Sequence, residues 1–412
     1  MTTNPTNSGA ARPAHTPAPI VSAKDAAAKQ AALELPLVKI RDLAVSFDNR
    51  GGPRIQAVDG NSLTIYPRQT VAVVGESGCG KSVSAMSMLQ LIPRPPGRFD
   101  RGTIMFQSRN APTPGGYIDL LKLNNNEIRK IRGGEIAMIF QEPMTSLNPV
   151  YTVGDQIIEA ILLHQSVSVE GALEIALKAM RDVGIPEADR RIKQYPHQFS
   201  GGMRQRVMIA MALACQPRLL LADEPTTALD VTIQAQILEL LTSLKSERDM
   251  AVMLITHDLG VVAENADVVC VMYAGRVVEY ARVHDLFERR LHPYTRGLLN
   301  SIPRLGARRD RLVTIKEIID NPEEFTRLPG ASEGVRPWWP WHDAPADLVR
   351  LNEPAGDYVL HEVLPDHWVG LWRTKGVVEA SANRRAPDLN YRRPQEPAAD
   401  AAPEQGTPAA TA

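Results

Sequence analysis

Residues 70–82, TVAVVGESGCGKS, are the stretch that decides the fold of this chain. Residues 70–74 form a short, apolar, β-branched run that is typical of a buried strand, and residues 82–91 have the spacing of a helix. The loop between them fits the pattern GxxxxGK[ST], in which glycines let the backbone turn its N–H groups onto phosphates. The flanking strand and helix favour this interpretation over a glycine-rich turn that carries a solvated lysine.

The loop residues therefore form the expected nucleotide-binding set. They are Gly75, Glu76, Ser77, Gly78, Cys79, Gly80, Lys81 and Ser82. We expect the Lys81 ammonium to reach the β- and γ-phosphates and the Ser82 hydroxyl to coordinate Mg²⁺.

A second apolar run, residues 219–222, ends in the two carboxylates Asp223 and Glu224. Ligands of open α/β sheets collect at the carboxyl ends of the strands. Asp223 is accordingly expected to hold Mg²⁺, mostly through water, and Glu224 to act as the general base on the attacking water. The alternative is an exposed acidic turn before Pro225, and the preceding phosphate loop argues against it.

A third element, residues 199–206, reads FSGGMRQR and precedes an Ala- and Met-rich helix. The Ser200 hydroxyl, the backbone N–H groups of Gly201 and Gly202 and the helix N-terminus together suit an anion. By itself this segment could be an ordinary capped helix. Its position just before the acidic strand favours the anion site.

The order of the remaining elements predicts the fold class. Residues 37–47 and 55–65 alternate as strands around a turn, which predicts a small antiparallel sheet before the loop. Further along, a helical pattern at residues 233–244 is followed by a strand at residues 251–256. Alternating strands and helices predict an α/β protein with a mostly parallel sheet covered on both faces.

With these motifs in this order, residues 36–305 resemble the ATP-binding subunits of ABC transporters. The resemblance implies the P-loop fold of that family, with an antiparallel β-subdomain and a helical subdomain, and ATP and Mg²⁺ as cofactors. It also implies that Ser200 and Gly202 touch the γ-phosphate of ATP held on the loop of another subunit. This segment, residues 199–206, is the signature of the family. Because the chain has one signature and one copy of the domain, the resemblance implies a dimer.

Other site residues follow from the same resemblance. Gln141, in FQEP, matches the loop that contacts Mg²⁺ and senses the membrane subunits, and His257, in LITHD, matches the switch histidine on the γ-phosphate. Asp230, in ALD, matches the loop facing the partner subunit. Phe47 is the best match to the aromatic platform for adenine, although it could equally be a core strand residue, and Tyr66 is a weaker rival.

Several stretches point to one branch of the family, the importers of dipeptides and oligopeptides. They are residues 148–149 (NP), 195–198 (YPHQ), 292–295 (HPYT) and 301–305 (SIPRL). The branch implies a second ATPase subunit, two transmembrane permease subunits and an extracytoplasmic solute-binding protein. The same motifs could serve an importer of oligosaccharides, opines or nickel. Because no cysteine follows Cys270, an iron–sulfur cluster beyond the core is not expected.

Composition limits partners and location. The chain has 46 Lys and Arg against 47 Asp and Glu, so no bulk field attracts nucleic acid. Its scattered cysteines fit a reducing cytosol, and no run is long and apolar enough for a membrane span. We expect a peripheral protein on the cytoplasmic face of the inner membrane.

Low-complexity composition predicts disordered tails at residues 1–35 and 376–412. Between the second tail and the ATP-binding domain lies an accessory segment, residues 306–375, with all five tryptophans and three histidines, His342, His361 and His367. It could pack its aromatics as a small domain, form a regulatory pocket or bind a metal, although the histidine spacing matches no usual ligand pattern.

Two other functional classes remain as alternatives. A soluble ABC ATPase for DNA repair or ribosomes would carry long coiled coils or two ATP domains, and this chain has neither. A non-catalytic regulatory subunit would have lost Glu224 or His257, and both are present. An ATPase that drives import is the leading hypothesis.

Overall fold

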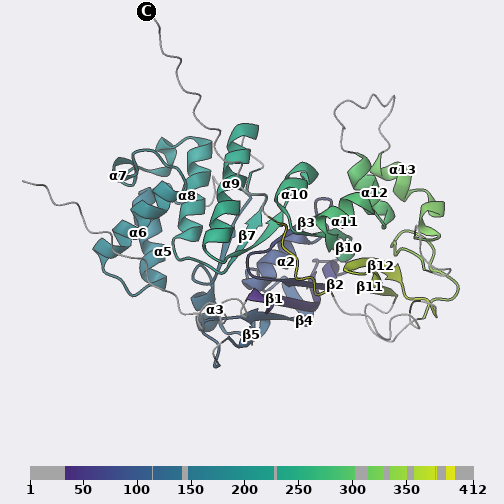
Figure 1. Cartoon of the computed structure of the whole chain (residues 1–412). Helices are drawn as coiled ribbons and strands as arrows, with labels where there is room; N and C mark the ends of the chain where they lie inside the picture. Colours follow the sequence, from purple (N-terminus) through teal and green to yellow (C-terminus); the bar gives the residue numbers. More distant parts are fainter. Residues whose placement is uncertain are drawn as a thin grey trace, which may run out of the picture.

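The computed structural model describes residues 33–113, 115–141, 147–226, 230–301, 314–328, 335–349, 357–375, 377 and 387–394. Two sheets dominate the molecule, with a helical region at one end and the accessory segment at the other (Figure 1). The smaller sheet is antiparallel and has the order β2-β1-β4-β5. Its strands are β1 (Val38–Phe47), β2 (Ile55–Ile65), β4 (Gly97–Gln107) and β5 (Tyr117–Asp119).

The larger sheet has the order β11-β12-β10-β9-β3-β8-β7-β6. Five strands are parallel: β9 (Val268–Tyr273), β3 (Thr70–Val74), β8 (Ala251–Ile255), β7 (Leu219–Asp223) and β6 (Ile136–Ile139). Three antiparallel strands extend it: β10 (Arg276–Arg282), β12 (His367–Trp372) and β11 (Tyr358–Leu364). The expected mostly parallel sheet is confirmed, and the antiparallel edge is an addition.

The accessory segment adds two strands, β11 and β12, to the larger sheet. Its strand β12 pairs with β10, with Tyr280 opposite Trp368, and so it continues the sheet of the ATP-binding domain.

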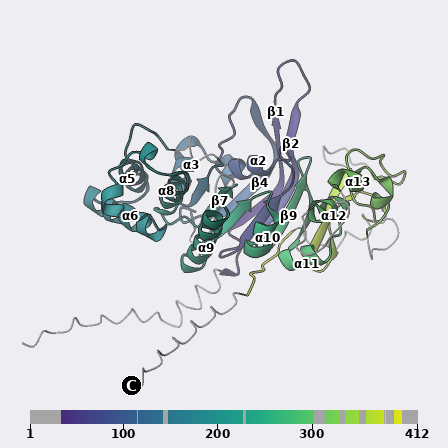
Figure 2. The same cartoon turned by 90° about the horizontal axis from the view of Figure 1, so that it is seen from above.

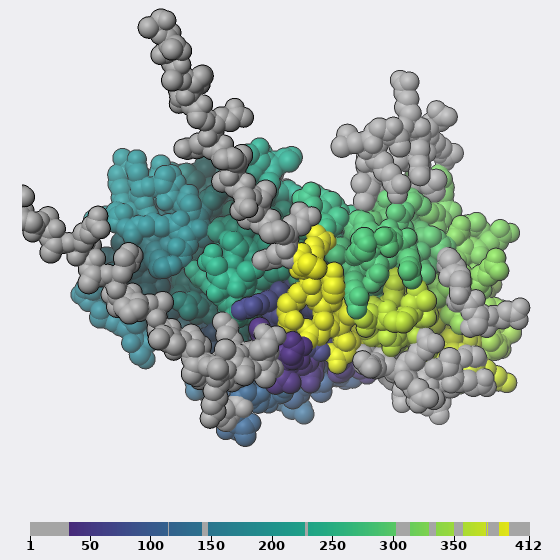
Figure 3. Space-filling model, viewed as in Figure 1, coloured from purple at the N-terminus to yellow at the C-terminus, as the bar shows by residue number. Residues whose placement is uncertain are grey.

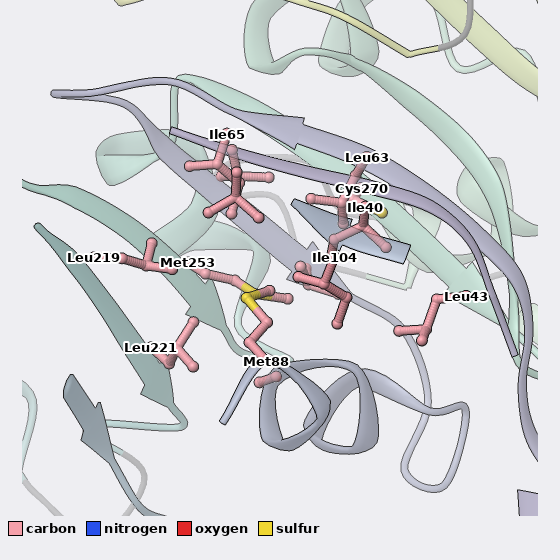
Figure 4. Packing of buried hydrophobic residues seen from close by; sticks show 14 of the residues in the cluster. Ile40, Leu43, Leu63, Ile65, Met88, Ile104, Leu219, Leu221, Met253 and Cys270 are labelled. Atoms are coloured by element: carbon pink, nitrogen blue, oxygen red, sulfur yellow. The ribbon is translucent and has the colours of Figure 1, made fainter. Parts of the chain in front are cut away.

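Successive side chains of the central strands point to opposite faces of the larger sheet, and both faces are apolar and covered. In β7, Leu219 and Leu221 face the smaller sheet, whereas Leu220 and Ala222 face the helical region. Figure 4 shows Met88 of α2 (Lys81–Met88) close to Met253 and Leu221 of the larger sheet, with Ile104 of the smaller sheet also in the cluster. These residues belong to one buried apolar cluster, which we call the first core. In it the two sheets pack against each other and against the helix that follows the phosphate loop.

The helical region follows β6, and Figure 2 shows it set apart from the β1–β2 hairpin. Its helices are α5 (Val153–His164), α6 (Val169–Asp182), α7 (Ala188–Arg191) and α8 (Gly201–Leu213). Among the described residues no single helix is long and apolar enough to cross a bilayer. Helices α5 and α6 pass that test only as a pair, bent by 118°.

The remaining helices cover the sheet or connect its strands. They are α2 (Lys81–Met88), α3 (Asn125–Ile131), α9 (Val231–Glu247), α10 (Leu259–Asn265), α11 (Val283–Glu288), α12 (Pro293–Asn300) and α13 (Ile315–Ile319). Short 3₁₀ turns are η1 (Leu120–Lys122), η2 (Pro196–Gln198) and η3 (Pro322–Phe325).

The expected disordered tail beyond residue 376 is wrong for residues 387–394. The Leu389 side chain is buried in the first core cluster. Gln69 donates hydrogen bonds to the carbonyls of Leu389 and Tyr391, both at 2.8 Å, and Arg392 donates to the carbonyl of Leu33 at 2.7 Å. The yellow C-terminal stretch lies against purple N-terminal residues in Figure 3. The rest of both expected tails, up to residue 32 and beyond residue 394, lies outside the described residues.

Aromatic packing dominates the accessory segment. Four tryptophans are buried, namely Trp338, Trp339, Trp368 and Trp372. Trp341 is 73% exposed, and its indole N–H donates to the Tyr273 hydroxyl at 3.1 Å. Within the described part of the chain, no group of three or more His, Cys, Asp or Glu side chains could hold a metal ion.

A buried histidine caps helix α12. The Nδ1 atom of His292 accepts a hydrogen bond from the Tyr294 N–H at 3.2 Å, and its Nε2 atom lies 3.0 Å from the Trp338 carbonyl. Both contacts suit a neutral ring with its proton on Nε2, which donates to the carbonyl. Burial lowers the pKa of His292 from 6.5 to about 4.

We expect this histidine to make the fold acid-sensitive. Because the folded-state pKa lies below the unfolded value, the unfolded chain binds the extra proton, and stability falls as pH drops through the window between them. From about pH 7 to about pH 5, the free energy of unfolding should fall by about 2 kcal/mol through this group. Denaturant titration at the two pH values measures the loss.

His292→Asn should make this decrease in the free energy of unfolding smaller, because asparagine can still cap the helix and does not titrate. His284→Asn is the matched control, since His284 is exposed. An unchanged acid loss in His292→Asn would contradict the assignment.

Candidate nucleotide site

The phosphate loop leaves β3 at Val74 and enters α2 at Lys81, as expected. A Cβ at Gly75, whose φ is +148°, would lie 2.2 Å from the Met272 carbonyl oxygen. A Cβ at Gly80, whose φ is +99°, would lie 2.3 Å from the Ala57 carbonyl oxygen. Only glycine lets the loop pass this closely to the neighbouring backbone.

Lys81 is held inside the loop. Its Nζ atom donates hydrogen bonds to the carbonyl oxygens of Gly75 and Glu76, both at 2.8 Å. The side chain is buried, so the ammonium already points into the space that the loop encloses. The Lys81 ammonium can therefore exchange its two carbonyl acceptors for phosphate oxygens when a nucleotide binds.

The two carboxylates follow β7 at the same edge of the sheet. Asp223 is buried, and burial raises its pKa, while a hydrogen bond from Ser82 acts in the opposite direction. Glu224 has a φ of +47°, and its N–H donates to the Ile255 carbonyl at 2.9 Å. This backbone conformation is sparsely populated for a non-glycine residue and turns the chain sharply after Asp223.

Glu224 is the centre of a three-residue cluster. Gln141 Nε2 donates to Glu224 Oε2 at 3.0 Å, and His257 Nδ1 lies 3.3 Å from Glu224 Oε1. Gln141 follows β6 and His257 follows β8, the two parallel neighbours of β7. The carboxyl ends of the three strands therefore bring together residues that are 83 and 33 positions apart in sequence.

These residues border one cavity of about 500 Å³. Its wall includes Gly75, Glu76, Ser77, Gly78, Gly80, Lys81, Ser82, Gln141, Glu224 and His257, together with Ala57, Val74, Val83, Leu259, Leu298, Ser301 and Ile315. Leu298 and Ile315 come from α12 and α13, and our sequence analysis did not anticipate them. No chemical motif marks such apolar wall residues, so only the fold reveals them.

The signature residues lie elsewhere. Ser200 caps α8, and its hydroxyl accepts from the Met203 N–H at 3.3 Å. Asp230 caps α9 and accepts from the Ile233 N–H at 3.0 Å, while residues 228 and 229 lie outside the described residues. Ser200, Gly201, Gly202 and Asp230 are not among the residues that line the cavity. The predicted signature residues therefore lie apart from the cavity beside the phosphate loop.

Neither aromatic candidate for adenine stacking lines the cavity. The partly buried Phe47 packs against the first core, where its ring lies 3.2 Å from the position of a Cβ on Gly97. Tyr66 is buried, and its hydroxyl donates to Asp388 at 2.6 Å. Phe47 as the adenine platform stays a prediction, as does its alternative as a core strand residue.

A buried glutamine, absent from our sequence predictions, connects the signature helix to the acidic strand. The Gln205 side chain in α8 donates to the carbonyl of Pro225, directly after Glu224. A polar residue on the buried face of an Ala- and Met-rich helix was the available signal.

Comparisons with known proteins show which families this chain resembles. The family model for ABC transporters matches residues 58–227, and the model for the C-terminal region of oligopeptide/dipeptide transporters matches residues 278–330. A probable peptide ABC transporter ATP-binding protein, y4tR of Sinorhizobium fredii, is 48% identical over 343 residues, which are 83% of this chain and 96% of that protein.

Two further proteins extend the likeness. The oligopeptide transport ATP-binding protein OppD of Bacillus subtilis is 47% identical, over 78% of this chain and 79% of that one. Among solved structures, a dimeric post-hydrolysis state of the ATP-binding cassette MJ0796 bound to ADP and Pi matches with a TM-score of 0.52. It is 28% identical and covers 60% of this chain and 98% of that one.

Proposed function

This chain belongs to the ATP-binding subunits of the peptide-importing ABC transporters, and we propose how its residues divide the work of that family. It is an ATPase that powers peptide import, binds ATP as a dimerising cassette and works with permease subunits. The observation that carries the assignment of roles is the Gln141–Glu224–His257 cluster, which borders the same cavity as the phosphate loop.

Glu224 is the general base in this proposal. Its carboxylate accepts from Gln141 and lies beside His257, so its two oxygens have fixed directions at the cavity wall. A base held this way can take the proton of a water that attacks the γ-phosphate. His257, on the other side of the carboxylate, would contact the γ-phosphate.

Mg²⁺ fits the remaining oxygen donors. Burial leaves the Asp223 carboxyl short of solvation, and a divalent cation would favour its charged form. We propose that the Ser82 hydroxyl, Asp223 through water, and Gln141 hold the ion. The ion would neutralise charge on the phosphates.

The separated signature supports a shared site. Because Ser200, Gly201 and Gly202 do not line the cavity of their own chain, we propose that they close the site on the loop of a second ATPase subunit, and that Asp230 faces that subunit. We also propose that Phe47, whose ring is partly buried, offers a ring face to adenine.

Docking to the permeases would use the helical region. An apolar group is exposed there, including Val150 (71%), Tyr151 (56%) and Leu163 (63%). Exposed apolar groups of this kind suit a protein partner. We propose that the helical region docks the chain onto the membrane part of the transporter, which two permease subunits form, at the cytoplasmic face of the inner membrane and beneath an extracytoplasmic binding protein.

Peptide-stimulated hydrolysis tests the proposal. When the chain is co-purified with its permease subunits and second ATPase and placed in liposomes, peptide-loaded binding protein should raise ATP hydrolysis several-fold. The binding protein loaded with an oligosaccharide, opine or nickel ion is the comparison. Stimulation only by one of these solutes would replace peptide with that solute.

A further inference from the structure

One hydrogen bond joins the phosphate loop to a helix 218 residues further along the chain. The N–H of Glu76 donates to the hydroxyl oxygen of Tyr294 at 2.9 Å. Tyr294 lies in the first turn of α12 and is completely buried. The roles assigned above to the loop do not use this contact.

The contact holds the same peptide group that holds Lys81. The Glu76 N–H and the Gly75 carbonyl belong to one peptide unit, and in a trans peptide they point in opposite directions. Tyr294 binds one end, and the Lys81 ammonium binds the other at 2.8 Å. In a site of low dielectric constant, hydrogen bonds in series polarise one another. The tyrosine hydroxyl therefore acts on the lysine through one rigid group.

Aromatic packing fixes the tyrosine. The Tyr294 ring lies 4.8 Å from Tyr273 and 5.8 Å from Trp339, and Tyr273 stacks on Trp339 at 4.1 Å. Phe325 completes the cluster, 5.2 Å from Trp339. Trp339 and Phe325 belong to the accessory segment, so that segment supports the phosphate loop through Tyr294.

We propose that Tyr294 is a positioning residue for ATP binding, which orients the Gly75–Glu76 peptide and thereby the Lys81 ammonium. The inference rests on the proposed function, since it assumes that Lys81 meets the phosphates. It gives the accessory segment a part in setting ATP affinity.

Tyr294→Phe tests this, because it keeps the ring and removes only the acceptor oxygen. The Glu76 N–H would lose its partner and the peptide its fixed orientation, so ATP affinity should fall about fivefold to tenfold. Titration of the full-length chain with a fluorescent ATP analogue measures the dissociation constant. In the assembled transporter, KM for ATP should rise by a similar factor, with kcat within about twofold of the parent.

Tyr273→Phe is the matched control. Tyr273 lies in the same cluster, but its hydroxyl accepts from the Trp341 indole N–H instead of from the phosphate loop. Its ATP affinity should equal that of the parent. A merely structural role for Tyr294 would instead lower the active fraction, and so kcat, without raising KM.

Glu76→Pro removes the donor from the other side of the bond. The Glu76 side chain is exposed, but the proline ring would replace the N–H that meets the Tyr294 hydroxyl and would crowd that oxygen. This variant alone should therefore weaken ATP binding. Adding Tyr294→Phe should then weaken it no further, whereas in Glu76→Ala, which keeps the N–H, the full effect of Tyr294→Phe should persist. Equal losses in both backgrounds, or parental affinity in Tyr294→Phe, would overturn the proposal. Failure of the parent itself to bind ATP would instead overturn the proposed function.

Discussion

Glu224→Gln should abolish most ATP hydrolysis by the assembled transporter while leaving ATP binding intact. Glutamine has nearly the same shape and can still meet Gln141 and His257, but it cannot accept a proton from water. Loss of a positioned general base lowers turnover by about 10²- to 10⁴-fold. Steady-state phosphate release from the co-purified complex measures turnover, and analogue titration measures binding.

The same variant should trap the subunits together. If ATP held on one loop is closed by the signature of the other subunit, uncleaved ATP keeps the pair associated. Light scattering should show an ATP-dependent dimer of Glu224→Gln that the parent forms only transiently. Glu239→Gln, on the exposed part of α9, is the control and should turn over like the parent. Parental hydrolysis by Glu224→Gln in the complex would remove Glu224 as the base.

Local sequence patterns predicted the strands around the site closely, because burial on both faces of the sheet determines which residues these strands can have. β3 must be apolar on both faces, since Val71 and Val73 enter one core and Ala72 and Val74 another. A continuous apolar run bounded by a glycine loop is then unambiguous. Helix α9 begins two residues earlier than expected because Asp230 caps it.

The cluster around Glu224 depends on strand order, which local sequence does not encode. Gln141, Glu224 and His257 meet only because β6, β7 and β8 are adjacent and parallel. Family resemblance implied the three residues, but it did not supply their contacts. In the same way, nothing near Tyr294 in sequence indicates that its hydroxyl meets Glu76.

Residues 387–394 show how composition can mislead. Averaged over residues 376–412, proline and alanine hide a short run in which Leu389 and Tyr391 provide apolar anchors. Its backbone carbonyls accept from Gln69 and Thr64, side chains already positioned by the core. A segment can thus become ordered on an existing surface although it has no core of its own.

Lys81→Ala should remove ATP binding at working concentrations and, with it, turnover. The buried ammonium is the positive charge that the loop itself contributes, and charge-assisted hydrogen bonds to phosphate are about twice as strong as neutral ones. Losing two such bonds, each worth about 1.5–3 kcal/mol, should weaken ATP affinity by about 10²-fold or more. Analogue titration of the full-length chain measures this loss.

The Lys81→Ala experiment must separate a loss of ATP affinity from a loss of folding stability. Without ATP, the Lys81 ammonium satisfies the carbonyls of Gly75 and Glu76, so alanine leaves two acceptors without their donor. Thermal unfolding in the absence of nucleotide reports that cost separately. Lys122→Ala is the control, because Lys122 is exposed and, among the residues that the structure describes, forms its ion pair with Asp119 at 3.5 Å. Lys81→Ala with parental ATP affinity and a folded core would show that the loop does not bind phosphate through its lysine.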